Sequence, residues 1–341
     1  MSAITTSNTA LINRLLNDVA PDILKKLVQT HQTAEIAQQY GNVKKTLTFI
    51  VRKKDKRILR GFKADGVAKG DEFSYDSIDL EVKKFMAILD LTASEDKVEA
   101  FNAHLVSSGI VATDLSDDMY LTDLFLYLIA EAQEEIDGEL EDADWQAIKV
   151  TSGGNAADDA DAIHKFDGFR RLAATLATAG KGTIVTTGAI TSANAMTKVE
   201  EFFVGFDTQI KRTGAIIFCS YALFDNYKIH YRAANSGREL GTTRLEGTNY
   251  EGAEIYLGGK KTMLMPVQGF GTDDALIGCR AKDMAIGYSM VGELDVQKRG
   301  FTIFGYLEMK YGVQFLQQIP GYLVVNDRLI AVEVTTPRTN A

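Results

Sequence analysis

Residues that mark disulfide frameworks and metal centres are scarce in this chain. Its 341 residues include two cysteines, four histidines and one tryptophan. Cys219 and Cys279 have no CxxC spacing, so we interpret both as small core side chains in a reducing compartment. The first ten residues lack the basic start and apolar stretch of a secretion signal, and the most apolar run, residues 119–130, contains Thr122 and Asp123. We therefore expect cytoplasmic synthesis, with no signal-directed export and no membrane span.

Motifs for catalysis are also missing. The histidines form no His-x-x-x-His pair and have no adjacent cysteine, so the sequence predicts structural roles at surface or half-buried positions for His31, His104, His164 and His230. There is no Gly-x-Ser-x-Gly elbow, and the acids are too numerous for a catalytic pair to be chosen. We predict no enzyme activity, no catalytic residues, no metal and no cofactor. An active site assembled from distant residues stays open as an alternative.

Three glycine-containing segments match nucleotide-binding loops only in part. Residues 258–262 read Gly-Gly-Lys-Lys-Thr, but Lys260 stands where a P-loop has its second glycine. Both flanks are β-like, whereas a P-loop must open a helix. Residues 269–271 (Gly-Phe-Gly) and 180–183 (Gly-Lys-Gly-Thr) lack the remaining glycines of a dinucleotide fingerprint. We predict a turn at each segment.

Charge is the most informative property, because the two signs are separated along the chain. Residues 44–63 carry nine bases and one acid, which leaves 28 bases against 45 acids elsewhere, a net charge of −17. Residues 131–144 hold eight acids and no base. Opposite blocks on one chain favour a protein that binds copies of itself. The residues that we expect to make these contacts between subunits are Arg52, Lys53, Lys54, Lys56, Arg57, Arg60, Glu131, Glu134, Glu135 and Asp137.

The basic segment is predicted to form a long hairpin. Leu47, Phe49 and Val51 alternate with polar residues, and the alternation returns at Ile78 and Leu80 after a glycine-containing tip. An isolated hairpin is at best marginally stable in water, so it needs another surface to lie on. We favour docking on the acidic surface of a neighbouring copy. A solvated edge that deters aggregation and a nucleic-acid-binding segment are the alternatives.

The remaining pattern predicts helices and strands in mixed order. Residues 1–42 favour a helical arm, and residues 121–140 favour a long helix with one apolar stripe. Further helices are expected at 194–211 and 221–233. Strands are expected at 215–220, 253–257, 262–267, 275–279, 284–290, 302–316 and 322–334. The fold class is therefore α+β.

This order of elements resembles the major capsid proteins of tailed bacteriophages, which have the Hong Kong 97-type shell fold. The resemblance covers essentially the whole chain and depends on order and spacing rather than on a short diagnostic motif. Matching stretches are 116–140 for the spine helix, 166–169 (Phe-Asp-Gly-Phe), 189–231, 253–267, 275–278 and 301–325. The implied parts are an N-terminal arm (1–42), an extended β-hairpin called the E-loop (43–92), a P-domain with the spine helix (93–167), an A-domain (168–292) and returning P-domain strands with a C-terminal tail (293–341).

The function that this resemblance implies is that of a container. Many copies would form the hexamers and pentamers of an icosahedral virion capsid that encloses double-stranded DNA without sequence-specific binding. Implied partners are the chain itself, a separate scaffolding protein, a portal and decoration proteins, with no membrane. The separate scaffold is expected because only about forty residues precede the hairpin. An encapsulin-like compartment shell and a soluble α+β enzyme remain the alternatives.

Overall fold

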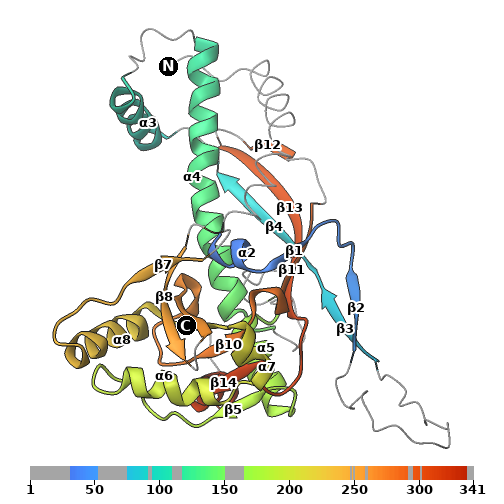
Figure 1. The fold of residues 1–341 in the computed structure, drawn as a ribbon. Coiled ribbons are helices and arrows are strands. Elements are labelled where there is room, and N and C mark those ends of the chain that lie inside the picture. Colours follow the sequence, from blue (N-terminus) through green and yellow to red (C-terminus); the bar gives the residue numbers. More distant parts are fainter. Residues whose placement is uncertain are drawn as a thin grey trace, which may run out of the picture.

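Two large β-sheets, a two-stranded hairpin and one long helix organise the described part of the chain (Figure 1). In the computed structural model, helix α4 (Asp117–Gln146) runs alongside one sheet and ends against helix α5 (Phe169–Thr178) and the 3-10 turn η4 (Gln268–Phe270) beside the other sheet. The fold is mixed α+β, as predicted. The residues that the structure describes are 31–52, 75–90, 94–109, 117–149, 165–245, 248, 250–257, 260–290, 295–299 and 302–335.

Helix α4 forms where the apolar stripe predicted it and extends six residues further at its C-terminal end. Leu124, Leu128 and Leu140 are buried along that stripe. Helix α3 (Glu95–Ser107) packs against α4, and the Ser94 hydroxyl begins it by accepting a hydrogen bond from the Lys97 backbone N–H. The confirmed stripe shows that local periodicity was sufficient to define this element.

The sheet beside α4 has five strands within the described residues. Its longest strand, β13, pairs with β11 and β12 on one side and with β4 on the other, all antiparallel, and β1 joins β11 in parallel. The strands predicted at 284–290 and 302–316 are confirmed. The five strands are β1 (Gln38–Tyr40), β4 (Lys83–Asp90), β11 (Met284–Met290), β12 (Asp295–Arg299) and β13 (Thr302–Phe315).

The N-terminal arm was predicted to be helical to residue 42, and that prediction is wrong over its last residues. Helix α2 (Gln32–Ile36) is followed directly by β1. Residues 38–40 become a strand because β11 offers a free edge to pair with, and such a partner is not visible in the local sequence. Residues 1–30 lie outside the described residues.

The predicted hairpin is confirmed by the pairing of β2 (Thr46–Arg52) with β3 (Tyr75–Glu81). Its base lies on the β11–β13 pair, with Leu80 and Val82 buried there. Gly287 and Gly312 are opposite each other in that pair, and a Cβ on Gly287 would stand 2.8 Å from Leu80 Cδ2. A Cβ on Gly312 would overlap the Glu81 carbonyl oxygen. The two glycines therefore form the shallow seat that lets the hairpin approach the sheet.

The second sheet has seven strands within the described residues, in the order β5-β14-β10-β6-β9-β8-β7. Four predicted strands, at 215–220, 253–257, 262–267 and 275–279, are confirmed. Residues 260–266 form a strand that pairs with β8, so no helix opens after residues 258–262 as a P-loop requires. The strands are β5 (Thr183–Val185), β6 (Ile216–Cys219), β7 (Thr242–Arg244), β8 (Glu251–Leu257), β9 (Lys260–Pro266), β10 (Ile277–Cys279) and β14 (Val324–Asn326).

Hydrophobic clusters cover both faces of this seven-stranded sheet. Phe218 of β6 belongs to the cluster that contains α5 (Phe169–Thr178) and the end of α4, while its neighbour Ile217 belongs to the cluster that contains α6 (Ala195–Val204) and α8 (Tyr221–Ala234). Successive residues of a strand point to opposite faces, so a strand between two cores reads as a continuous apolar run. The free thiols of Cys219 and Cys279 are buried here, which confirms their interpretation as core side chains.

The helix predicted at 194–211 is divided into α6 and α7 (Thr208–Thr213). Gly205 ends α6 close to the Val185 side chain, where a Cβ would not fit. Asp207 then caps α7 by accepting a hydrogen bond from the Gln209 backbone N–H. The apolar spacing continued through both helices, which is why the sequence pattern alone joined them.

The strand predicted at 322–334 is also wrong after residue 326. Helix α9 (Asp327–Ile330) and a π-helical turn η6 (Ala331–Thr335) follow β14. Buried Asn326 causes the change, because its side-chain oxygen accepts hydrogen bonds from the backbone N–H groups of Leu329 and Leu276. The same residue therefore ends the strand and caps the helix.

The η6 turn is fastened to helix α5 by a buried arginine. Arg170 of α5 forms ion pairs with Glu333, at 2.9 Å, and with Asp273, at 2.5 Å. Arg170 also donates a hydrogen bond to the Phe270 carbonyl of the 3-10 turn η4 (Gln268–Phe270). A second 3-10 turn, η5 (Ala281–Asp283), precedes β11. Among the described residues, no helix is long and apolar enough to cross a membrane.

Replacing Gly312 with alanine is expected to lower the free energy of unfolding by about 1–3 kcal/mol, because the new methyl group overlaps the Glu81 backbone. Gly138→Ala is the matched control, since Gly138 lies in α4 with open space around its Cα. It should raise stability by up to about 1 kcal/mol through helix propensity. Urea unfolding of both variants measures the difference, and an equal effect of the two would contradict the proposed seat.

Arg170→Met is expected to lower the free energy of unfolding by about 3–5 kcal/mol, because it removes the cation that pairs with the buried Glu333 carboxylate. Lys198→Met breaks a partly exposed pair with Glu201 and should change stability by no more than about 1 kcal/mol. Thermal and urea unfolding of the two variants provide the comparison. Losses of similar size would show that the Arg170 pair has no special weight.

Candidate functional site

Of the six basic residues expected to contact a neighbouring subunit, only Arg52 lies among the described residues. Arg52 ends β2 opposite Tyr75 of β3, so the block continues from the end of the hairpin that is farther from the seat. Lys53, Lys54, Lys56, Arg57 and Arg60 lie outside the described residues. Their contact with a neighbouring subunit stays a prediction.

Part of the acidic block forms an exposed face on α4. Glu131, Glu134 and Glu135 are all exposed, and their i, i+3, i+4 spacing places them side by side on the helix. Tyr127 donates a 2.6 Å hydrogen bond to the Glu131 carboxylate, and this bond raises the pKa of the phenol. We call Glu131, Glu134 and Glu135 the acidic face. It is an electronegative surface available to a partner.

Three further acids of the block turn inward, which the sequence did not reveal, whereas Glu139 and Asp142 are exposed. Asp137 is half-buried, and Glu141 and Asp144 are buried. Their i, i+4, i+7 spacing places them on one side of α4, the side that meets the residues preceding and beginning α2. The acidic segment therefore has one side in solvent, while Asp137, Glu141 and Asp144 form a polar core element on its other side.

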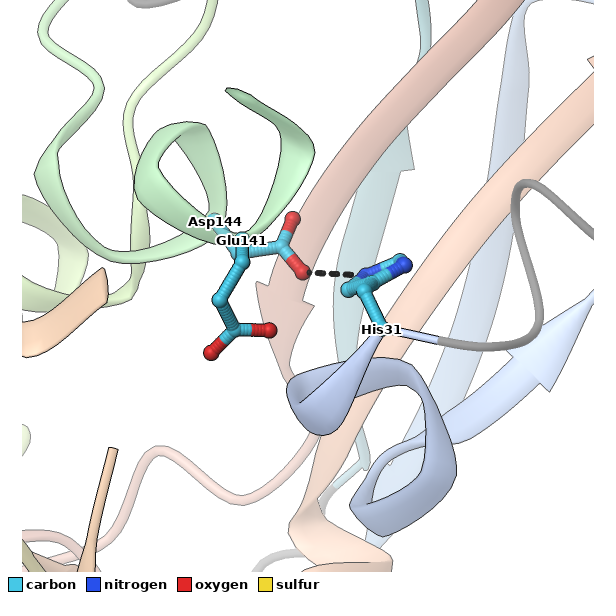
Figure 2. A group of neighbouring side chains, drawn as sticks. All are labelled: His31, Glu141 and Asp144. Atoms are coloured by element: carbon cyan, nitrogen blue, oxygen red, sulfur yellow. Dashed lines mark hydrogen bonds and ion pairs between the residues drawn. The ribbon is translucent and has the colours of Figure 1, made fainter. Parts of the chain in front are cut away.

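Asp144 is the centre of the first of two buried networks (Figure 2). His31 Nε2 lies 2.9 Å from Asp144 Oδ2, and the Tyr311 hydroxyl of β13 donates to the same oxygen at 3.0 Å. His31 Nε2 and the Tyr311 hydroxyl are themselves 3.1 Å apart. Three distant segments, the arm, α4 and β13, therefore meet at one carboxylate.

Glu141 is the centre of the second network. Its Oε2 accepts from the Thr33 backbone N–H at 2.8 Å, and its Oε1 accepts from the Thr33 hydroxyl at 2.7 Å. The indole N–H of Trp145, the single tryptophan of the chain, points at the same place, 2.5 Å from Thr33 Oγ1 and 3.2 Å from Glu141 Oε1. A Cβ on Gly269 would overlap the Glu141 carbonyl oxygen, so η4 packs directly on this turn of α4.

Burial raises the pKa of the central carboxyl group in both networks. Desolvation, with the nearby Asp144 charge, raises the pKa of Glu141 to about 7. Desolvation also raises the pKa of Asp144 despite its bond to His31. For His31, desolvation opposes the charged form, but the hydrogen bond and charge of Asp144 outweigh it, so its pKa is raised.

His31, Glu141 and Asp144 also have the chemistry of a metal site, with ligand atoms within 4.8 Å of one another. Their hydrogen bonds argue against that role. Both Glu141 oxygens already receive N–H or O–H donors, and the protons of Thr33 and Trp145 would face an incoming cation. The arrangement fits a closed hydrogen-bond network that fixes the arm to α4.

The histidine predictions have mixed outcomes. His104 is exposed and His230 is half-buried, as expected, and His230 Nδ1 accepts from the Met196 backbone N–H. His31 is only 4% exposed, so its predicted surface or half-buried position is wrong. Its partners Asp144 and Tyr311 are 113 and 280 residues away in sequence, and no local spacing signals them. His164 lies outside the described residues.

Comparisons with known proteins give a fold and no close relative. No protein-family model and no curated protein sequence matches the chain. Among solved structures, a chain of the satellite phage P4 procapsid with its size determination (Sid) protein matches with a TM-score of 0.59 at 9% identity, covering 91% of this chain and 90% of that one.

Two further structures match at a TM-score of 0.50 and 12% identity. A chain of the empty GTA particle capsid is matched over 87% of this chain and 90% of its own length, and a chain of the cyanophage A-1(L) capsid over 87% and 92%. All three are named for capsids or procapsids, and the match extends over nearly the whole of each chain. The chain therefore has the Hong Kong 97-type fold of tailed-phage capsid proteins, as the order of its elements predicted.

Proposed function

We propose that this chain is the major capsid protein of a tailed phage, and that its copies form the hexamers and pentamers of an icosahedral shell around double-stranded DNA. The observation that carries this proposal is the match to the P4 procapsid chain over about nine tenths of both chains. A fold shared over the whole length, rather than over one domain, supports a shared architectural use. The proposed location is the virion capsid, after synthesis in the host cytoplasm.

The hairpin is the part of the subunit that reaches outward. Its base is seated on the Gly287–Gly312 pair, on the opposite face of the sheet from Tyr311, which contacts α4. Farther along, Ile50 is 75% exposed and Tyr75 is 61% exposed, and the register places both on one face of the hairpin. Large apolar side chains left in water favour burial against a partner.

Charge then selects where this apolar face docks. In the proposal, the basic block beyond β2 meets the acidic face of α4 in an adjacent subunit. Exposed ion pairs contribute roughly 0 to 1 kcal/mol each, so they set register while apolar contact supplies adhesion. Obligate interfaces commonly bury about 2,000 Å² or more, which requires the hairpin to lie along its neighbour over much of its length.

The five parts of the chain have separate tasks in this proposal. The hairpin region (43–92) links subunits, the P-domain with α4 (93–167, with 293–341) supplies the rigid frame, and the A-domain (168–292) supplies the compact body. The arm (1–42) ties the frame to the hairpin. A separate scaffolding protein, a portal and decoration proteins complete the set of proposed partners.

Replacing Arg52, Lys53, Lys54 and Arg57 with glutamate should abolish rings and shells, because the hairpin would then repel the acidic face. Electron microscopy and sedimentation, with and without a candidate scaffold, measure assembly, and circular dichroism checks that the subunit remains folded. The compensating control adds Glu131→Lys, Glu134→Lys and Glu135→Lys to the same chain, which should restore particles. Normal assembly by the first variant would refute the docking proposal.

The isolated subunit is expected to bind duplex DNA no more tightly than about 10⁻⁴ to 10⁻⁶ M at physiological salt, the range of non-specific binding. The net charge of −17 outside residues 44–63 repels a polyanion, which suits a container that must not adhere to its contents. Fluorescence anisotropy over a salt series measures this. Tight binding with a steep salt dependence would favour the nucleic-acid-binding alternative for the hairpin.

A further inference from the structure

The last ten described residues of the arm before Gly41 have an unusual combination of contacts. We call His31–Tyr40, which comprises α2 and β1, the strap. Its first residues are buried against the C-terminal half of α4, and its last residues form the parallel edge of the five-stranded sheet. Figure 1 shows it crossing between α4 and the strands that support the hairpin. The strap therefore connects the C-terminal half of α4 to the five-stranded sheet.

Polar groups, rather than apolar packing alone, hold the start of the strap. Besides the contacts of His31 and Thr33, the Gln32 side chain donates to the Pro266 carbonyl at 2.9 Å and accepts from the Gln268 backbone N–H at 3.3 Å. All three residues are buried. Buried polar groups are costly unless they remain paired, so a change in one partner weakens the whole contact.

The end of the strap contacts the hairpin. The Tyr40 ring packs on the Phe49 ring of β2 with centroids 4.9 Å apart, and the Val43 N–H donates to the Tyr288 carbonyl of β11. Only five residues separate β1 from β2. If the strap detaches from α4 and β11, the hairpin therefore loses a contact on one side.

We propose that the strap is a proton-dependent latch: it docks with uptake of protons by the His31–Glu141–Asp144 cluster, and loss of those protons releases it and loosens the hairpin. The geometry that carries this is a single histidine facing two buried carboxylates on one side of α4, within a site closed by Thr33, Trp145 and Tyr311. This latch belongs to the single chain and stands independently of the proposed shell.

The charges around the cluster are predominantly negative. From α4, Asp137 and Asp144 act with Glu141, and Tyr311 faces Asp144 from β13. Tyr221 of α8 and Tyr250 before β8 lie within electrostatic reach of Glu141, and Glu35 of α2 lies within reach of Tyr250. When His31 and Glu141 both lose their protons, two buried carboxylates remain beside each other with no cation in the cluster. Mutual repulsion and desolvation then disfavour the docked strap.

The sign of the pH dependence follows from these shifts. In the folded chain the pKa of Glu141 is raised from 4.5 to about 7, those of His31 and Asp144 are also raised, and the docked strap covers all three groups. The docked strap therefore binds more protons than the released strap, and its stability is fully present at acidic pH. That stability is lost as pH rises from about 5 through 7 and on through the raised pKa of His31.

Hydrogen exchange of the full-length chain between pH 5.5 and 8.5 tests the latch. After correction for intrinsic exchange, the protection factors of strap amides should fall about tenfold or more over this range, since one unit of pKa shift corresponds to a factor of ten. Amides of β6 (Ile216–Cys219) should keep their protection. The fluorescence of Trp145 provides a second readout, because its indole N–H contacts the strap directly.

Glu141→Gln removes the central titration while it preserves shape, so the fall in strap protection should be several-fold smaller. Glu139→Gln, an exposed change on the same helix, is the matched control and should behave like the original chain. His31→Asn provides an independent variant if Glu141→Gln does not fold. Strap protection that is constant with pH, or that falls only together with β6, would overturn the proposal, as would an unchanged fall in Glu141→Gln.

Discussion

The burial of two carboxylates at the end of α4 is the constraint on which the arrangement of the chain depends. An ionised side chain is removed from water only when other groups replace its hydrogen bonds. Glu141 and Asp144 obtain theirs from Thr33, His31 and Tyr311, which come from the arm and from β13. The helix, the arm and the sheet must therefore fold together. The arm takes its position because it supplies hydrogen bonds to the buried carboxylates of α4.

Close backbone approach is the second requirement, and glycine meets it at the two junctions that matter most. Gly269 lets η4 pack on the carbonyl of Glu141, beside the second carboxylate network. Gly287 and Gly312 let the hairpin base cross the sheet on the face opposite Tyr311. One strand, β13, therefore transmits position from the spine helix on one face to the hairpin on the other. The segment that reads as a failed dinucleotide fingerprint, residues 269–271, has a packing role instead.

These junctions give the proposed shell subunit a rigid frame and an outward-reaching hairpin. The frame presents the acidic face of α4 to solvent. The hairpin has complementary features: Ile50 and Tyr75 are exposed apolar side chains, and the sequence beyond Arg52 is basic. A subunit with complementary surfaces on different elements binds head to tail, and such contacts form closed rings when the rotation between copies closes. The strap between these elements is well placed to link the state of the frame to that of the hairpin.

The sequence by itself determined the elements whose signal is local. The stripe of α4, the alternation of β2 and β3, the buried strand β6 and the α+β order that resembles phage capsid proteins all follow from periods of 3.6 or two residues. Tertiary structure alone decided which acids are surface and which are core, because Glu131 and Glu141 look alike in sequence and differ only in what packs on them. It also decided that residues 38–40 form a strand, that Asn326 ends one, and that His31 meets Asp144 across 113 positions. Those outcomes depend on partners far away in the chain, and hydrogen bonds to distant partners have no periodic signature.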